Sequence, residues 1–425
     1  MADNEEGMVE ESAPSSGDDR ISVRNLVIGS KLEQDIFDPN GVLLLRAGHE
    51  ILQRFVTNLR RRGVREIRRT SSGAARRRAA PPDRTAEDAA VAATTPRLDS
   101  AVEAASYDAL PGGLRASGAR LDLPALHDEL QIAQDFRRRA IEQYARLTAD
   151  IIEGRPVDLD AVQGTLGEFA AMFDRDASLS LLAMDLKSSP EGFLYEHGIN
   201  VSMLTMTVAL FMGFSGDQAI EAGLGALFHD VGMLKVPETI RLAERRLSDD
   251  EFYEVRRHPA FSANLLDRLD HVRETSILVA YQMHERHDGS GYPCGRVGRY
   301  IHPLARVAAV ADSYAAGCGW RPYRAPLRPY DSMVEIILKD TRSGRFDADV
   351  VRGFLDCLSL FPVGSEVNLS DARTARVLRS NAGQHTRPVV LPVGADDSAA
   401  ELDLAVDETI QIVEALGGDA APEAA

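Results

Sequence analysis

Two short stretches of this chain carry its strongest signal: LFHDVGMLKVP at residues 227–237 and YQMHERHDGSGYP at residues 281–293. In the first stretch, His229 and Asp230 follow AIEAGLGALF, an apolar run with helical spacing, and precede a glycine and a Val-Pro pair, which end helices. The chain contains two other His-Asp pairs, but neither lies in such a context. The pattern therefore predicts that His229 and Asp230 lie at the buried end of a helix.

Side chains able to bind metal recur through the helical part of the sequence. They are four histidines and two aspartates, and all except the adjacent pair fall on different predicted segments: His197, His229, Asp230, His258, His284 and Asp312. A single buried histidine is more often a core residue bonded to a backbone carbonyl, but the whole set favours a metal site. Imidazoles with a few carboxylates suit Fe, Mn, Zn or Ni, whereas Ca²⁺ prefers oxygen ligands alone. The sequence thus predicts a site for a divalent transition metal.

Asp230 is the residue most suited to contact two metal ions. Adjacent residues on a helix point about 100° apart, so His229 and Asp230 can both reach one cluster only from its edge. A carboxylate in that position can bridge two ions, which together activate water and neutralise a phosphate oxygen during in-line attack. The pattern therefore indicates phosphodiester hydrolysis, with Asp230 and His229 at the catalytic centre.

Composition limits the classes of function. The chain has 425 residues, of which 44% are hydrophobic, enough for two or three domains and at least one sizeable core. Its 65 acidic against 48 basic residues give a formal net charge of −17, which argues against a nucleic-acid binder held by the phosphate backbone. A small nucleotide can still be bound by local arginines. The three widely spaced cysteines, Cys294, Cys318 and Cys357, predict reduced thiols.

The sequence also carries signals about cellular location. Its first residues are acidic and polar, without the basic and apolar parts of a secretory signal. No segment reaches the ~18 to 20 apolar residues that a membrane span needs. We therefore expect a cytoplasmic protein without a membrane span.

Changes in composition and periodicity divide the chain into regions. Residues 1–20 are predicted to be a disordered tail, and residues 21–70 a small α+β module with a hairpin turn at residues 38–41. Residues 71–120 are predicted to be a flexible linker, although a run of three arginines leaves contact with an anionic partner open. The remaining regions are a helical connecting or dimerisation segment at 121–189, a bundle of at least five helices at 190–360, a small β/α appendage at 361–412 and a tail at 413–425.

Residues 195–358 resemble the HD-GYP family of cyclic-di-GMP phosphodiesterases, a subgroup of the HD-domain hydrolases. The matching blocks are YEHGINV, LFHDVGMLKVP, RRHP, HERHDGSGYPCGRVG, IHPLARVAAVADSYAA, RPYR and GRFDADVVRGFL. The module at residues 21–69 also resembles the small N-terminal domain often placed before such domains. The resemblance implies a mainly α fold, an HD-type helical bundle with a small N-terminal α+β module and a short C-terminal β appendage, in a bacterial signalling protein.

The family pattern implies roles for individual residues. It makes the same four histidines and two aspartates the ligands of two divalent metals, with Fe or Mn expected. The signature loop maps onto Gly291, Tyr292 and Pro293, beside the metals and in contact with substrate or a partner. The RPYR block offers Arg321 and Arg324 as contacts to a phosphate or a guanine edge, with a surface salt bridge as the alternative for both.

The implied reaction is hydrolysis of cyclic-di-GMP to pGpG, with GMP as a further product. The implied partners are a diguanylate cyclase or another signalling protein, and a second copy of the chain, which we expect to bind through the 121–187 helices as a homodimer.

Some positions depart from the family pattern. Met233 stands where a lysine is common, and Met283 where a histidine usually precedes His284. Phe193 replaces a glutamate of members with a third metal, and Ala315 replaces an aspartate. At most two metals are therefore expected. The departures also leave a second function open, that of a catalytically degenerate module that binds cyclic-di-GMP or docks a protein without turnover.

Overall fold

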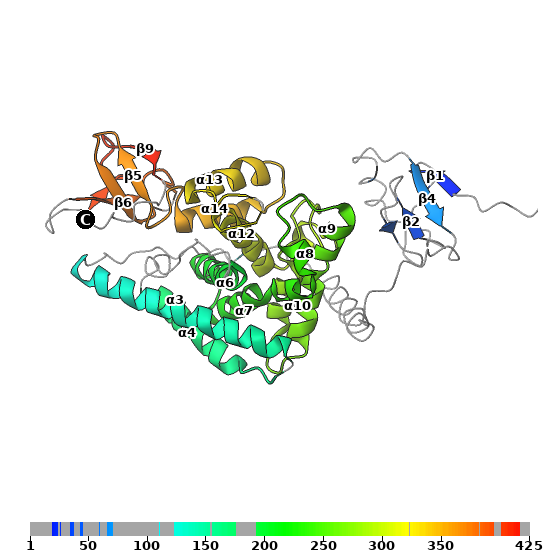
Figure 1. The fold of residues 1–425 in the computed structure, drawn as a ribbon. Coiled ribbons are helices and arrows are strands. Elements are labelled where there is room, and N and C mark those ends of the chain that lie inside the picture. The colour runs from blue at the N-terminus through cyan, green and yellow to red at the C-terminus, as the bar shows by residue number, and fades with distance from the viewer. Residues whose placement is uncertain are drawn as a thin grey trace, which may run out of the picture. The chain divides into compact units, whose positions relative to one another are not determined.

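The structure is a computed structural model, and the chain divides into two compact units, Met1–Arg84 and Thr85–Ala425 (Figure 1). The residues it describes are 19–23, 26, 35–37, 43–45, 59, 66–70, 110, 123–153, 155–175, 193–322, 324–381, 383–394 and 401–416. The predicted linker at 71–120, except Leu110, and most of the two predicted tails lie outside these residues.

The N-terminal unit contains a four-stranded antiparallel sheet. Its strands are β1 (Asp19–Ser22), β2 (Asp35–Phe37), β3 (Leu43–Leu45) and β4 (Glu66–Thr70), in the order β1-β4-β2-β3. Strands β2 and β3 pair across the predicted turn. Strand β1 begins two residues before the predicted start of order, because Asp19 and Arg20 pair with Arg69 and Arg68. The helical part of the predicted α+β module lies outside the described residues, apart from Leu59, which is helical and buried.

Two long helices occupy the segment for which the sequence predicted amphipathic helices. They are α3 (Leu123–Ile152) and α4 (Leu159–Arg175). Each buries one face with helical spacing, which in α3 includes Phe136, Ala140 and Tyr144. Both helices pack on α6 (Phe193–Phe211), and α4 also packs on α7 (Gly216–Phe228) (Figure 1).

Helix α6 lies at the centre of the helical bundle. It is apolar on nearly all sides, as expected for a helix surrounded by others, and α7, α12 and α14 pack against it. A mainly α fold is thereby confirmed. Among the described helices none is long and apolar enough to cross a bilayer. The other helical elements are η2 (Val231–Lys235), α8 (Glu238–Arg241), α9 (Asp249–Val255), α10 (His258–Asp267), α11 (Glu274–Gln282), η3 (Gly298–Tyr300), α12 (Pro303–Cys318), α13 (Pro329–Glu335), the π-helical η4 (Ile336–Thr341) and α14 (Ala348–Leu358).

The C-terminal region forms a five-stranded antiparallel sheet in the order β8-β7-β6-β5-β9. A turn that contains Asp371 joins β5 and β6, which pair as a hairpin. Phe361, Val367 and Val377 contribute to a small core of their own. The strands are β5 (Glu366–Leu369), β6 (Thr374–Arg379), β7 (Val389–Pro392), β8 (Leu402–Asp403) and β9 (Ile412–Ala415).

Two expectations about this region need correction. The appendage was expected to mix β and α structure, but its described residues contain strands and turns without a helix. The tail was expected to begin at residue 413, whereas β9 extends to Ala415. Strand β9 is held by main-chain pairing with β5, and the Arg328 side chain donates to the carbonyl of Ala415 at 3.0 Å. Ile412 and Ala415 of β9 are only partly buried, against the small core that Phe361, Val367 and Val377 share.

Candidate metal centre

The predicted metal-binding side chains converge within the helical bundle, although they come from separate elements. They are His197 in α6, His229 directly after α7, Asp230 directly before η2, His258 at the start of α10, His284 shortly after α11 and Asp312 in α12. Two triads could each hold an ion, His197–His229–Asp230 and Asp230–His258–His284, with the ligand atoms of each triad within 4.8 Å of one another. Asp230 belongs to both triads, as a bridging carboxylate must.

The two carboxylate oxygens of Asp230 face different histidines. Oδ2 lies 3.3 Å from Nε2 of His229 and 4.0 Å from Nε2 of His197. Oδ1 lies 3.2 Å from Nε2 of His258 and 3.8 Å from Nε2 of His284. Each oxygen therefore belongs to one triad, so this carboxylate can serve two cations at once.

Asp312 contacts both triads from α12. Its Oδ1 lies 3.1 Å from Nε2 of His197 and 3.8 Å from Nε2 of His229. Its Oδ2 lies 3.5 Å from Nδ1 of His284. Asp312 therefore adds a second carboxylate to the cluster, and all six predicted residues lie together.

The orientation of the imidazoles fits a metal. In His229, His258 and His284, Nε2 is buried and faces the Asp230 carboxylate, without a well-directed hydrogen bond among the described residues. The other ring nitrogen donates to a backbone carbonyl in two of them, from His229 to Ala226 at 2.6 Å and from His258 to Val255 at 2.7 Å. Such bonds fix the tautomer and direct the Nε2 lone pair into the cluster. A buried polar atom without a partner costs roughly 1–3 kcal/mol, which a bound cation offsets.

Burial and neighbouring charges shift the pKa values of the ligands within the cluster. Burial lowers the pKa of His284 to about 4, and burial together with the nearby Arg321 cation lowers the pKa of His197. Burial also acts to lower the pKa of His229, but the Asp230 carboxylate outweighs it and raises that pKa to about 9. Burial opposes ionisation of Asp230, yet the facing histidines hold its pKa well below the usual range. A metal bound at His229 would therefore displace a proton.

Close packing between η2 and α10 sets the separation of two ligands. A Cβ at position 232 would lie 2.2 Å from the carbonyl oxygen of His258, so only glycine fits there. The amide of Gly232 donates to Oγ of Ser262 at 2.9 Å, and that hydroxyl donates to the carbonyl of His229 at 2.5 Å. Ser262 thus ties the backbone of His229 to α10. Sequence analysis missed it, because a lone serine after a His-Pro pair has no recognisable signature.

The signature loop packs directly on a metal ligand. The Tyr292 ring stacks on the His284 imidazole, with centroids 5.1 Å apart and planes 13° from parallel. The Tyr292 amide donates to the carbonyl of His284 at 3.1 Å. A Cβ on Gly291 would lie 2.3 Å from the amide nitrogen of Arg286, so a glycine is required for this approach. The loop therefore restrains the orientation of His284.

Glu285 is a second residue that sequence analysis missed. Its buried carboxylate accepts from the amides of Cys294 at 2.8 Å and Arg296 at 2.9 Å, which anchors the segment after Pro293. Burial raises the pKa of Glu285 to about 7 against the effect of these amide donors. The sequence places Glu285 directly after the predicted ligand His284, but this position alone does not reveal that the carboxylate is buried.

The two predicted substrate arginines have different surroundings. Nη2 of Arg321 lies 3.2 Å from Nε2 of His197, so this guanidinium is at the cluster. Arg324 instead donates to the carbonyls of Gly317, at 3.0 Å, and of Ala316. These are carbonyls at the end of α12, which lack helical partners. The donors of Arg324 are therefore used in capping, and no described contact joins it to the ligands.

Two of the departures from the family pattern are core residues. Met283 is fully buried and Ala315 nearly so, and both belong to the main apolar cluster. The neighbouring His287 lies outside both triads, with Nδ1 3.8 Å from a carboxylate oxygen of Asp347. None of the three supplies a ligand to the cluster.

The part of the chain that holds this centre is similar to known proteins. Residues 181–350 match the family described as HD domain. The cyclic di-GMP phosphodiesterase PA4108 of Pseudomonas aeruginosa is 32% identical over 268 residues, 63% of this chain and 63% of the relative. The cyclic di-GMP phosphodiesterase response regulator RpfG of Xanthomonas campestris pv. campestris is 29% identical over 231 residues, 54% and 56% of the two chains.

A solved structure also matches. Bd1817, a HDG"Y"P protein from Bdellovibrio bacteriovorus, covers 80% of this chain and 98% of its own at 16% identity, with a TM-score of 0.43. The chain spans less than two thirds of the length of both curated relatives.

Proposed function

This chain belongs to the HD-GYP family of HD-domain proteins, and we propose that it is a metal-dependent phosphodiesterase that hydrolyses cyclic-di-GMP to pGpG, with GMP as a further product. The observation that carries the proposal is the pair of ligand triads that share Asp230. Both curated relatives are named as cyclic di-GMP phosphodiesterases, which supports the choice of substrate.

The proposed cofactor is a pair of divalent transition metals, Fe or Mn. One would be held by His197, His229 and Asp230, and the other by Asp230, His258 and His284, with Asp312 beside both. When bound, such a pair supplies activation of water and neutralisation of phosphate charge. Asp230 and His229 would act at the catalytic centre as ligands of these metals.

Substrate contacts are proposed on two sides of the cluster. Arg321, beside His197, is suited to a phosphate oxygen because its guanidinium offers several fixed donors. On the signature-loop side, the Arg256 guanidinium carbon lies 4.5 Å from the Phe252 ring centre and 5.7 Å from that of Tyr292. Aromatic rings and guanidinium planes stack on nucleobases. This second side is therefore our proposed site for a guanine base, with Gly291 and Pro293 shaping the loop that carries Tyr292.

One observation favours a second candidate function. Met283, where the family pattern has a histidine, is fully buried among apolar side chains. A centre that lacks this imidazole could bind cyclic-di-GMP without hydrolysing it. The protein would then be a sensor or a docking module for a diguanylate cyclase or another signalling protein.

Turnover and metal content measured together distinguish the two candidates. Protein purified without oxygen and loaded with Fe(II) or Mn(II) is expected to linearise cyclic-di-GMP, and Asp230→Ala should lose turnover by at least about 100-fold together with bound metal. Asp371→Ala removes an exposed carboxylate in the β5–β6 hairpin and should change neither. If metal-loaded wild-type protein binds cyclic-di-GMP but does not hydrolyse it, the proposed phosphodiesterase activity is wrong and the sensor function is favoured.

We also propose that the protein is a homodimer in the cytoplasm of a bacterial cell. The proposed contact for a second copy lies on the predicted helical segment, where Ile132 of α3 is 54% exposed. Light scattering of the full chain is expected to give a dimer that Ile132→Glu weakens. The matched control is Val406→Glu, at an exposed position beyond strand β8. A dimer unaffected by Ile132→Glu would contradict the contact at this position.

A further inference from the structure

We infer that Tyr144, in α3, is a positioning residue for the His229-Asp230 pair of the metal centre. The inference rests on the proposed function for its effect on turnover, whereas its effect on metal binding is independent of that function. Tyr144 precedes residues 181–350, which match the HD domain, so the connecting helix contributes to a centre whose ligands all lie within the matched region.

Tyr144 contacts residues beside two ligands of the same triad. Its hydroxyl donates to the carbonyl oxygen of Leu227 at 2.6 Å, two residues before His229. Its ring packs edge-on against Phe228 at a centroid distance of 5.7 Å and against Tyr195 at 6.1 Å. Phe228 immediately precedes His229, and Tyr195 lies two residues before His197. A single buried side chain thus supports both histidines of the first triad.

The hydroxyl bond satisfies a backbone group that the end of α7 leaves open. The last four carbonyls of a helix lack helical partners. Here the His229 ring donates to Ala226, Tyr144 donates to Leu227, and Ser262 donates to His229. Side chains therefore hold successive parts of the turn that presents His229 and Asp230. Among these donors, Tyr144 is the one from outside the matched HD domain.

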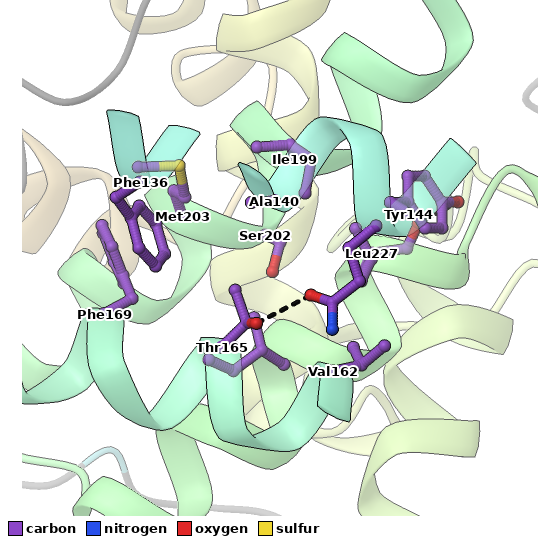
Figure 2. A pocket seen from close by; sticks show the side chains of 12 residues that line it. Phe136, Ala140, Tyr144, Val162, Thr165, Phe169, Ile199, Ser202, Met203 and Leu227 are labelled. Atoms are coloured by element: carbon purple, nitrogen blue, oxygen red, sulfur yellow. Dashed lines mark hydrogen bonds between the residues drawn. The ribbon is translucent and has the colours of Figure 1, made fainter. Parts of the chain in front are cut away.

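The surroundings of Tyr144 leave it little freedom to move. A Cβ on Gly198 would lie 2.9 Å from the Tyr144 ring, so the backbone of α6 passes directly over it. Figure 2 shows Tyr144 beside Leu227 at one end of a mainly apolar pocket between α3, α4, α6 and α7. The cavity is about 20 Å³, room for about one water molecule. The link from α3 to the end of α7 is therefore the hydrogen bond from the Tyr144 hydroxyl to Leu227.

The first test is a Mn(II) titration of the full chain by calorimetry. Tyr144→Phe keeps the ring but removes the hydroxyl. We expect Mn(II) to bind roughly tenfold more weakly at one of the two sites, which is the lower end of the loss seen when groups that orient metal ligands are removed. In turnover of cyclic-di-GMP at subsaturating Mn(II), we expect kcat to fall while KM is unchanged, because Tyr144 does not reach the substrate. Wild-type Mn(II) affinity in Tyr144→Phe would overturn the inference.

Thr165→Val is the matched control. The Thr165 hydroxyl donates to Oε1 of Gln143 at 2.7 Å in the same interface, a bond that a dashed line at Thr165 marks in Figure 2, and no described hydrogen bond joins this hydroxyl to the end of α7. We expect its Mn(II) affinity to equal that of the wild type. Equal weakening in both variants would mean general loosening of the interface and would also overturn the inference.

A second measurement needs no variant. Coupling between two sites is reciprocal, so Mn(II) bound to the wild-type protein should slow amide exchange at residues 140–148 of α3 as well as at residues 226–232. Exchange in the β5–β9 sheet should not change. Unaltered exchange at residues 140–148 would contradict the inference. Should the protein prove unable to hydrolyse cyclic-di-GMP, the titration and the exchange measurement would still decide the role of Tyr144.

Discussion

The ring of Tyr292 lies nearly parallel to the imidazole of His284, with centroids 5.1 Å apart. This contact makes the signature loop part of the support of a metal ligand. Because the Tyr292 ring also lies beside Phe252 and Arg256, Tyr292 links the metal centre to the proposed base-binding side.

Removal of the Tyr292 ring is expected to weaken metal binding. Tyr292→Ala takes away the surface that orients His284, so the bound metal equivalents should fall and the affinity of the Asp230–His258–His284 site should drop by roughly tenfold. Tyr292→Phe retains the stack and should bind metal like the wild type. Elemental analysis after dialysis measures the difference. Full metal content in Tyr292→Ala would show that the stack does not orient His284.

Ser262→Ala is expected to lower the stability of the folded protein. It leaves the buried amide of Gly232 and the carbonyl of His229 without their partner, at a cost of about 1–3 kcal/mol. Ser370→Ala, which removes an exposed hydroxyl bonded to the amide of Gln411, should cost less than about 0.5 kcal/mol. Urea unfolding of both variants provides the test. Equal losses of unfolding free energy in the two variants would show that the buried hydrogen bonds of Ser262 stabilise the protein no more than an exposed one.

The two arginines of the RPYR block should respond differently to substitution. Arg321→Gln removes a charged donor beside His197 and should lower kcat/KM for cyclic-di-GMP by roughly 10- to 100-fold, the equivalent of about 1.4–2.7 kcal/mol. Arg324→Gln removes the cap on α12 and should lower the thermal unfolding temperature while leaving kcat/KM near the wild-type value. Steady-state kinetics and thermal melts distinguish them. The opposite pattern would place Arg324 at the substrate.

His302 is expected to make stability depend on pH. Burial, aided by Arg306, lowers its pKa to about 4, and its Nδ1 accepts from the amide of Leu304 at the start of α12. The unfolded state therefore binds a proton more readily than the folded state does. The contribution to stability is fully present above pH 6.5 and is lost as pH falls toward 4, by up to about 3 kcal/mol.

His302→Asn tests this dependence because asparagine also caps helices but does not titrate. The difference in unfolding free energy between pH 7.5 and pH 5 should be smaller in the variant than in the wild type. Identical pH dependence in both proteins would exclude His302 as its source.

The three cysteines are expected to differ in reactivity. Cys294 is exposed, whereas burial raises the pKa of Cys318 to about 12 and also raises that of Cys357. Because the thiolate is the reactive form, a chromogenic disulfide reagent should modify one thiol rapidly in the native protein and three after unfolding. Cys294→Ser should abolish the rapid phase. A rapid phase that persists in this variant would contradict the burial of the other two thiols.

The sequence by itself determined which side chains could form the metal centre. Imidazole and carboxylate chemistry belongs to the residue, and the apolar run before His229 marks a buried helix end wherever that helix packs. The helical periodicity likewise predicted α3, α4 and the bundle, because amphipathic spacing is a local property. The structure brings His197, His229, Asp230, His258, His284 and Asp312 into one cluster.

Tertiary structure alone decided how that centre is supported. Tyr144 and Leu227 are 83 residues apart in the chain, and Ser262 and His229 are 33 apart, so neither hydrogen bond has a local pattern. The same is true of β9, whose strand structure comes from main-chain pairing with β5. Burial and hydrogen bonding depend on which elements meet in the folded chain, and a residue's immediate neighbours do not contain that information.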